Sequence, residues 1–287
     1  MNKRILSFES KQALKILPKR KKTDNKASCG KSLIIAGSKG MFGAAILAAT
    51  AAARVGSGYV LLMTIQKKFS SLRNPDFLVI DSKRKKIKDI SFSAIGIGPG
   101  LGQTTHSLQL LKQLIKLKPA HVVIDADALN LLAKNRLLQV PKSWIATPHE
   151  GELAKLLRIN ASAVRKDRLN SVIQAQKKLG CIVLLKGHNT LVATNKKVFK
   201  IKSGNSALAK AGTGDVLTGM ITGFLAQGLE AAEAACLGGY LHGAIADQWV
   251  MEKNDILSLM ATDILNRIPK VMQQIRKNKN TAITFLR

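Results

Sequence analysis

Short apolar runs that alternate with helical patterns constrain the fold of this chain most strongly. SLIIA at 32–36 leads into a glycine-rich loop and an alanine-rich helix that ends near Arg54. Further apolar runs follow, most of them separated by candidate helices: YVLLM at 59–63, FLVI at 77–80, AIGIG at 94–98, HVVIDA at 121–126, WIAT at 144–147 and CIVLLKG at 181–187. Continuous runs of this kind are typical of strands buried on both faces. We therefore expect an α/β fold, a three-layer α/β/α sandwich with a mostly parallel central sheet.

Other segments complete the expected order of elements. The pattern at 104–117 predicts a helix, TLVATNKKVFKI at 190–201 predicts a hairpin with a polar tip, and the last third is predicted to be helical. We find no internal repeat or low-complexity linker, so we expect a single domain over 32–287. Residues 1–31 are polar and basic, and we expect a basic N-terminal arm or a short amphipathic helix there.

Charge and composition argue against several classes of protein. The chain has 287 residues, and 46 basic against 17 acidic ones give a formal net charge of +29. Such a charge suits nucleic acid, but with only 4% aromatic residues a platform that stacks single strands is not expected. The three cysteines are far apart and lack CxxC spacing, which argues against a disulfide framework or a zinc site. With no secretory signal or membrane-spanning run in the sequence, we expect a cytoplasmic protein.

Polar and glycine-rich motifs follow the expected strands. They are GSKGMFGA at 37–44, GPGLG at 98–102, DADALN at 125–130, TPHEGE at 147–152 and KGHNT at 186–190. In parallel sheets of this kind, ligands bind beyond the carboxyl ends of the strands, so we expect these motifs to form one composite site. Neither glycine motif is a nucleotide fingerprint, because GSKGMFGA lacks P-loop spacing and Leu101 replaces the third glycine of GxGxxG.

The segment GNSALAKAGTGDVLTGMITGFLAQG at 204–228 joins a small, flexible loop to an apolar helix. Gly212 and Gly214 leave backbone N–H groups uncovered, so with Thr213 they are expected to form an anion hole at the start of that helix. Asp215 has two interpretations. It either caps the helix or takes a proton from a hydroxyl that attacks a phosphoryl group held in the hole.

The remaining candidates also have two interpretations each. Asp125 and Asp127 either organise waters around Mg²⁺ or cap the next helix. His149 and Glu152 stand three apart at a helix start, which is compatible with a site or with capping. Lys186 follows a buried strand, where its ammonium group either reaches a phosphate or lies on the surface. A further candidate, His242 in YLHGAIAD, is more typical of a core histidine than of a ligand.

Taken together, these motifs resemble the NAD(P)H-hydrate dehydratase family, a branch of the ribokinase-like fold. The order of the motifs matches that family from about residue 10 to about residue 270. TPHEGELAKLL and AGTGDVLTG together are specific for the family. DADAL and GPGLG match its order of motifs but are less specific. The runner-up is an ordinary kinase of the same fold that acts on a small vitamin precursor, and TPHEGE with DADAL and KGHNT favours the dehydratase.

The resemblance implies a repair reaction on a nicotinamide ring that has taken up water. ADP in the usual members, or ATP in others, would phosphorylate the C6 hydroxyl of hydrated NADH or NADPH with Mg²⁺ present. Phosphate would then leave, restoring the double bond and releasing AMP. Only the S epimer would be accepted. The stretch before the first expected strand is too short for an epimerase domain, so a separate epimerase is expected, and family members often form homotetramers.

The same resemblance assigns roles to individual residues. Asp215 would be the catalytic base, and Glu152 would have an indirect role at the metal. Contacts with the hydrated substrate are implied for Ala44, Gly100, His149 and Asp215. Contacts with the nucleotide are implied for Lys186, Gly187, His188, Asn189, Thr190 and Gly214.

Overall fold

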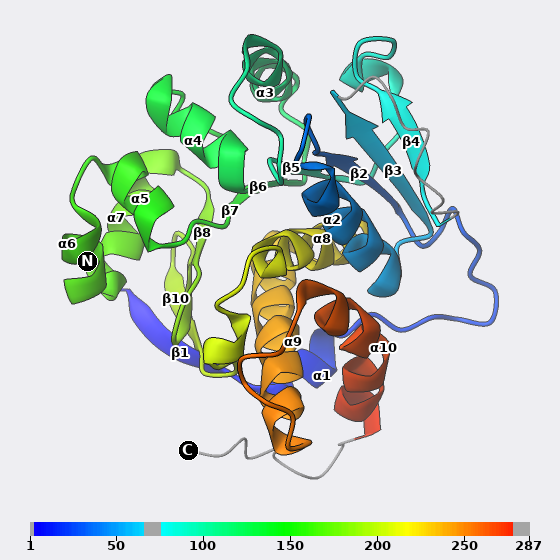
Figure 1. The fold of residues 1–287 in the computed structure, drawn as a ribbon, viewed down its shortest axis with the longest axis vertical. Helices are drawn as coiled ribbons and strands as arrows, with labels where there is room; N and C mark the ends of the chain where they lie inside the picture. Colours follow the sequence, from blue (N-terminus) through cyan, green and yellow to red (C-terminus); the bar gives the residue numbers. More distant parts are fainter. Residues whose placement is uncertain (1–2, 66–75, 278–287) are drawn as a thin grey trace.

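The central element of the fold is a ten-stranded sheet with helices on both faces (Figure 1). This computed structural model of the chain describes residues 3–65 and 76–277. Its strands are β1 (Arg4–Phe8), β2 (Lys31–Ile35), β3 (Tyr59–Thr64), β4 (Leu78–Asp81), β5 (Ala94–Ile97), β6 (Val122–Ile124), β7 (Ile145–Ala146), β8 (Ile182–Leu185), β9 (Thr190–Ala193) and β10 (Lys197–Ile201).

The sheet is mostly parallel, as the buried apolar runs predict. Its strand order is β1-β10-β9-β8-β7-β6-β5-β2-β3-β4. Among the described strands only β9 runs against the others, because the hairpin at 190–201 reverses the chain within the sheet. The carboxyl ends of β2, β5, β6, β7 and β8 therefore lie along one edge.

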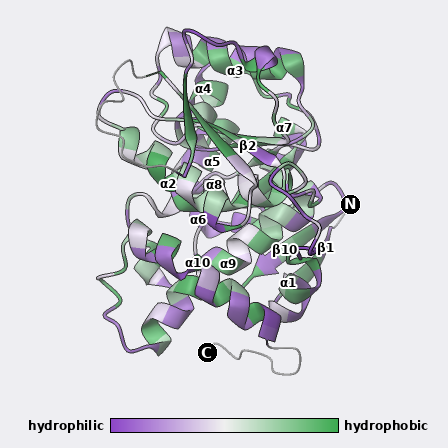
Figure 2. Cartoon of the chain, turned by 90° about the vertical axis from the view of Figure 1, so that its right-hand side faces the viewer, coloured by the Kyte–Doolittle hydropathy of each residue, from purple (hydrophilic) through white to green (hydrophobic). Residues whose placement is uncertain are grey.

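Helices cover both faces of the sheet, which confirms the three-layer architecture. One face carries η1 (Ile87–Asp89), α3 (Thr105–Leu117), α4 (Ala126–Lys134), α5 (Glu150–Leu157), α6 (Ala161–Lys166) and α7 (Arg168–Leu179). The other carries α1 (Ser10–Ile16), α2 (Phe42–Arg54), η2 (Ser206–Leu208), α8 (Thr213–Ala226), α9 (Ala231–Met251) and α10 (Ala261–Lys277). The middle strands are largely hydrophobic, and hydrophilic segments lie mainly at the periphery (Figure 2).

Small residues allow α2 and α8 to pack closely. A Cβ atom added at Gly219 would lie 2.1 Å from the carbonyl oxygen of Ala48, and one at Gly223 would lie 2.4 Å from Val55. Because no larger side chain fits between the two backbones, α8 lies against the sheet with nearly all of its residues buried. This packing holds the amino end of α8 beside the carboxyl ends of the strands.

Part of the amino-terminal segment forms a strand instead of the expected basic arm, and α1 agrees with the alternative expectation of a short helix. β1 pairs in parallel with β10, and Ala13 of α1 is fully buried. Phe8 is 5% exposed, and its ring contacts Tyr240 of α9 edge-on, with 6.1 Å between the ring centroids. A five-residue edge strand carries too little pattern to be recognised before its pairing partner is known. Among the described residues, no helix combines the length and hydropathy that a membrane crossing requires.

Candidate active site

The amino end of α8 is built by glycine and threonine. Gly212 is the N-cap residue and has φ 89°, a left-handed conformation that glycine adopts without strain. The single hydroxyl hydrogen of Thr213 is shared between the carbonyl oxygens of Leu208 and Lys210, which lie 2.9 and 3.0 Å from Oγ1. Asp215 therefore lies in the first turn of α8 and makes no capping hydrogen bond, so the capping interpretation of this residue is wrong.

Asp215 carries a carboxylate without a partner in the described part of the chain. It accepts no hydrogen bond and forms no ion pair with residues 3–65 or 76–277. Burial and the nearby carboxylate of Asp125 raise the pKa of Asp215 to about 7, against the opposing effect of Lys186. A carboxyl group with this pKa can both take and release a proton near neutral pH.

A buried ion cluster lies beside this carboxylate. The Nζ atom of Lys186 donates to Oδ1 of Asp125 at 2.8 Å and lies 3.8 Å from Oε2 of Glu152. The hydroxyl of Thr218 donates to Oδ2 of Asp125 at 2.7 Å. The side chain of Lys186 is 19% exposed, so the surface interpretation is wrong. Burial lowers the pKa of Lys186, but Asp125 and Glu152 outweigh it and the net shift is upward.

Close backbone contacts bring the strand-end motifs together. A Cβ atom at Gly98 would lie 1.8 Å from the carbonyl oxygen of Asp125, so only glycine permits this approach. Ala126, which lies between Asp125 and Asp127, has φ 45°, a strained value for a residue with a Cβ atom. Asp127 accepts a hydrogen bond from the backbone N–H of Gly102 at 2.7 Å. Neither aspartate uses its side chain to cap α4, and the capping interpretation fails for both.

The first glycine motif meets the second in the same region. A Cβ atom at Gly100 would lie 2.5 Å from the carbonyl oxygen of Met41 and 3.1 Å from Cβ of Ala44. The two residues predicted to contact the hydrated substrate, Ala44 and Gly100, are therefore neighbours. Asp127 links this wall to the ion cluster, because it accepts from the backbone of Gly102, two residues after Gly100, and its charge contributes to the raised pKa of Asp215.

A cavity of about 920 Å³ opens at the amino end of α8. Of the predicted nucleotide contacts, its lining includes Lys186, Gly187, His188, Thr190 and Gly214. Asn189 is not part of the lining, although it belongs to the same turn. Thr213 and Gly214 of the predicted anion hole also line this cavity, whereas Ala44 and Gly100 do not.

A family model described as NAD(P)H-hydrate dehydratase matches residues 32–270. The chain belongs to this family.

Named relatives and solved structures are consistent with that membership. The chain is 36% identical to an ADP-dependent (S)-NAD(P)H-hydrate dehydratase from Neisseria meningitidis, over 88% of this chain and 90% of the relative. It is 33% identical to a bifunctional NAD(P)H-hydrate repair enzyme from Moorella thermoacetica, over 93% of this chain. The chain spans about half the length of the bifunctional relatives, 54% in this case.

The crystal structure of an ADP/ATP-dependent NAD(P)H-hydrate dehydratase from Bacillus subtilis, co-crystallised with ATP/Mg²⁺, has the same fold. The TM-score is 0.85 at 30% identity, and the match covers 96% of this chain and 99% of that one. The ribokinase-like fold expected from the motifs is therefore confirmed.

His149 caps a helix, which is one of the two interpretations of the motif TPHEGE in this dehydratase-family chain. It is the N-cap of α5, and its Nδ1 atom accepts from the backbone N–H of Gly151 at 3.0 Å. Glu152 completes a capping box by accepting from the backbone N–H of His149 at 2.9 Å. The imidazole is 60% exposed at the rim of the cavity, so its predicted contact with substrate remains a prediction.

Two further residues hold the walls of the cavity and were missed at the sequence level. Arg168 of α7 donates to the carbonyl oxygen of Lys186 at 3.1 Å and pairs with Glu150. Asp247 of α9 accepts from the backbone N–H of Gly204 at 2.8 Å and from the side chain of Asn205 at 3.0 Å. Arg168 carries no motif signal, whereas Asp247 ends the quoted segment YLHGAIAD.

His242 is buried, as the sequence indicates, and it lies in the cavity wall. Burial lowers the pKa of His242 to about 4, so the ring is neutral at physiological pH. Its Nε2 atom has no hydrogen-bond partner within residues 3–65 and 76–277.

The carboxylates do not fit a directly bound metal ion. Asp125 is bonded through both oxygens, to Lys186 and Thr218, and Glu152 is bonded to the backbone of His149. The described residues contain no group of three or more histidine, cysteine, aspartate or glutamate side chains suited to a metal. An indirect role for Glu152 at the metal remains a prediction.

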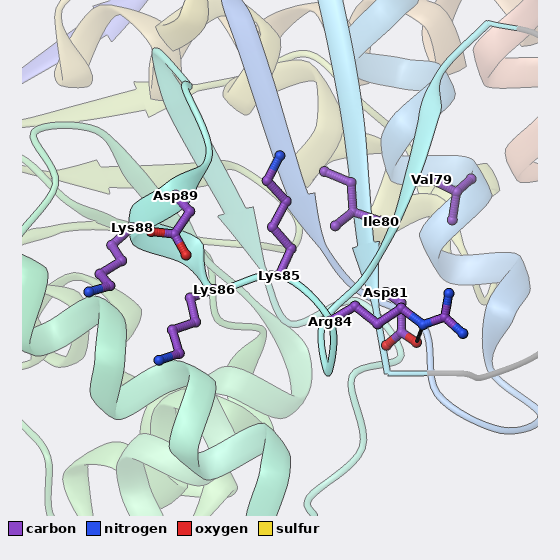
Figure 3. Close-up of a pocket in the computed structure, with 8 residues that line it drawn as sticks. All are labelled: Val79, Ile80, Asp81, Arg84, Lys85, Lys86, Lys88 and Asp89. Carbon is purple, nitrogen blue, oxygen red and sulfur yellow. Dashed lines mark ion pairs between the residues drawn. The ribbon is translucent and has the colours of Figure 1, made fainter.

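A second cavity of about 910 Å³ lies beside η1 and β4, the last strand in the order of the sheet (Figure 3). It is lined by Val79, Ile80, Asp81, Arg84, Lys85, Lys86, Lys88 and Asp89. Arg84 and Asp81 form an ion pair at 3.7 Å, and the arginine side chain is 88% exposed. None of the predicted site residues lines this cavity, so we place the site at the amino end of α8.

Proposed function

We propose that this protein is an ADP-dependent (S)-NAD(P)H-hydrate dehydratase. The nucleotide would phosphorylate the C6 hydroxyl of hydrated NADH or NADPH, and elimination of phosphate would then restore the nicotinamide double bond. The observation that carries this proposal is the unpartnered carboxylate of Asp215 beside the first backbone N–H groups of α8. Its pKa of about 7 suits a base that must accept a proton at neutral pH.

The first step is transfer of a phosphoryl group to oxygen. Asp215 takes the proton of the C6 hydroxyl while that oxygen attacks the terminal phosphorus and the bond to the leaving AMP breaks. The N–H groups of Gly212, Thr213 and Gly214 stabilise the negative charge on the moving phosphoryl group. Lys186, whose ammonium lies near Gly214, supplies a positive charge on the same side.

The second step is elimination. The C6–O bond breaks, phosphate leaves with the electron pair of that bond, and the electrons of the C5–H bond form the double bond as its proton passes to solvent water. Hydroxide is a poor leaving group, whereas phosphate is stable as an anion. The kinase-like site is therefore explained by a reaction whose net result is loss of water.

Mg²⁺ accompanies the nucleotide in this proposal, and when bound it neutralises phosphate charge. Support comes from the Bacillus subtilis relative, which was co-crystallised with ATP/Mg²⁺. We also propose a cytoplasmic location and a separate epimerase as the source of the S epimer. The bifunctional repair enzymes among the relatives support the link to an epimerase. A homotetramer is proposed from the family resemblance.

The test is recovery of reduced nicotinamide absorbance when the protein is mixed with hydrated NADH, Mg²⁺ and either ADP or ATP. We expect recovery, and we expect Asp215→Asn to lower turnover by roughly a hundredfold or more. Asp263→Asn is the matched control, because Asp263 occupies the first turn of α10, another helix. No recovery with either nucleotide, from folded protein, would refute the proposed function. Unchanged turnover in Asp215→Asn would refute the assignment of the base.

A further inference from the structure

Two buried carboxylates share one cation that belongs to the protein itself. Asp125 is 1% exposed and Glu152 is 6% exposed. They come from different segments, the carboxyl end of β6 and the first turn of α5. The Nζ atom of Lys186, which follows β8, lies 2.8 Å from Oδ1 of Asp125 and 3.8 Å from Oε2 of Glu152. The lysine that follows β8 thus lies between a carboxylate at the end of β6 and a carboxylate at the start of α5.

The cluster would be unstable without that charge. Two carboxylates withdrawn from water repel each other, and each must be neutralised by a proton, a basic side chain or a metal ion. Oxygen atoms from two carboxylates are also the donors that divalent cations such as Mg²⁺ and Mn²⁺ prefer. An ammonium group and a divalent cation would therefore compete for the same position.

The ammonium group is held firmly in that position. Asp125 is fixed through its second oxygen by the hydroxyl of Thr218. Glu152 is fixed by the backbone N–H of His149. The backbone carbonyl of Lys186 accepts from Arg168 at 3.1 Å, which anchors the base of the lysine. The ammonium nevertheless lies near α8, because a Cβ atom added at Gly214 would come within 3.4 Å of it.

We propose that Lys186 is the resident cation of the Asp125–Glu152 pair and excludes divalent cations from it. A metal ion would then enter this region only as part of a nucleotide complex. Asp125 is a positioning residue in this scheme, because it fixes the lysine charge at the amino end of α8. The inference concerns the cluster in the absence of nucleotide, so it stands or falls independently of the proposed function.

The test is Mn²⁺ binding to the full chain without nucleotide, measured by calorimetric titration and by thermal unfolding. Wild-type protein should show no saturable Mn²⁺ site that depends on Asp125. Lys186→Met keeps most of the side-chain stem but vacates the Nζ position. It should gain one Mn²⁺ site and unfold about 5 °C or more higher when Mn²⁺ saturates it. The double variant Lys186→Met/Asp125→Asn should lose that site.

Lys155→Ala is the matched control for loss of a lysine charge. Lys155 lies on α5 and donates to the side chain of Asn130 at 2.9 Å without contacting either carboxylate. It should gain no Mn²⁺ site. If Lys186→Met does not fold, Lys186→Ala replaces it in the same experiment.

Two results would overturn the inference. One is an Asp125-dependent Mn²⁺ site already present in wild-type protein, which would mean that the lysine does not exclude the metal. The other is absence of Mn²⁺ binding in a folded Lys186 variant, which would mean that the pair offers no cation position.

Discussion

Asp215 experiences opposing influences on its proton. The amino end of α8 and the ammonium of Lys186 favour the ionised carboxylate, whereas burial and the charges of Asp125, Asp127 and Glu152 disfavour it. Burial and the three neighbouring carboxylates have the larger effect, and the pKa of Asp215 lies near 7 instead of the ordinary 3.8. A carboxyl group at this value is a better proton acceptor than an exposed aspartate, while still being ionised in a large fraction of molecules.

The pH dependence of activity should follow this value. The base must be ionised, so kcat/KM should fall as the pH drops below about 7, with a slope of one proton. The measurement is the initial rate of nicotinamide recovery across the pH range at subsaturating substrate. A profile that stays flat down to pH 5 would be incompatible with a base of raised pKa.

The free energy of unfolding should depend on the same proton. The ionised form of Asp215, which activity requires, should make the folded protein less stable. Because the folded state raises the pKa of Asp215 from 3.8 to about 7, folding disfavours the ionised form. Ionisation of Asp215 takes nothing from the free energy of unfolding below pH 4. The loss grows between pH 4 and pH 7 and is complete above pH 7. Asp215→Asn should therefore stabilise the protein by roughly 1–4 kcal/mol at pH 8 and by much less at pH 5. Denaturant unfolding at both pH values measures the difference, and an equal gain at both would contradict it.

At the scale of the element, the start of α8 separates a folding role from a binding role. Gly212 has φ 89°, and a Cβ there would lie 2.7 Å from Leu47, so Gly212→Ala should cost about 1–2 kcal/mol of stability.

Gly214 has only ordinary contacts around its Cβ position, the nearest at 3.4 Å. Gly214→Ala should fold normally yet raise the KM for nucleotide, because its methyl group stands beside the anion hole. Denaturant unfolding and steady-state kinetics distinguish the two variants, and equal kinetic defects would contradict the assignment.

The loop before α8 depends on α9 in a testable way. Asp247 binds the backbone of Gly204 and the side chain of Asn205, which itself accepts from the backbone N–H of Ala207. Asp247→Ala should loosen this wall of the cavity and raise the KM for nucleotide by about tenfold, while kcat changes little. Asn205→Ala, which leaves the bond from Gly204 to Asp247, should give a smaller rise. The prediction fails if KM is unchanged in folded Asp247→Ala.

At the scale of the whole molecule, the net charge of +29 acts over a longer range than any contact. The proposed ligands are polyanions, so the field of the protein should steer them toward the cavity. Raising ionic strength from about 0.05 M to about 0.5 M should lower kcat/KM several-fold and leave kcat nearly constant, because salt screens this attraction. Stopped or continuous absorbance assays at fixed Mg²⁺ measure both constants. Salt-independent kcat/KM would mean that the charge does not act on substrate entry.

The sequence by itself determined the layered architecture and predicted which motifs gather at the carboxyl ends of the strands. Buried β-branched runs such as SLIIA and CIVLLKG can be satisfied only as interior strands, so their local pattern carries fold information. Glycine-rich motifs stand where the structure requires glycine: a Cβ atom at Gly98 or Gly100 would meet the backbone of another segment, and Gly212 has a left-handed φ of 89°. These features depend on residues that are neighbours in the chain, so they can be predicted from the sequence alone.

Only the tertiary structure decided how the charged residues pair. Asp125, Glu152 and Lys186 are separated by dozens of residues, and the same residue types would suit a metal site or a surface. Their pairing follows from the order of β6, β7 and β8 in the sheet, which places three strand ends side by side. The raised pKa of Asp215 and the role of β1 as a sheet edge have the same origin. Burial and electrostatic fields depend on neighbours in space, and a chain pattern does not record those neighbours.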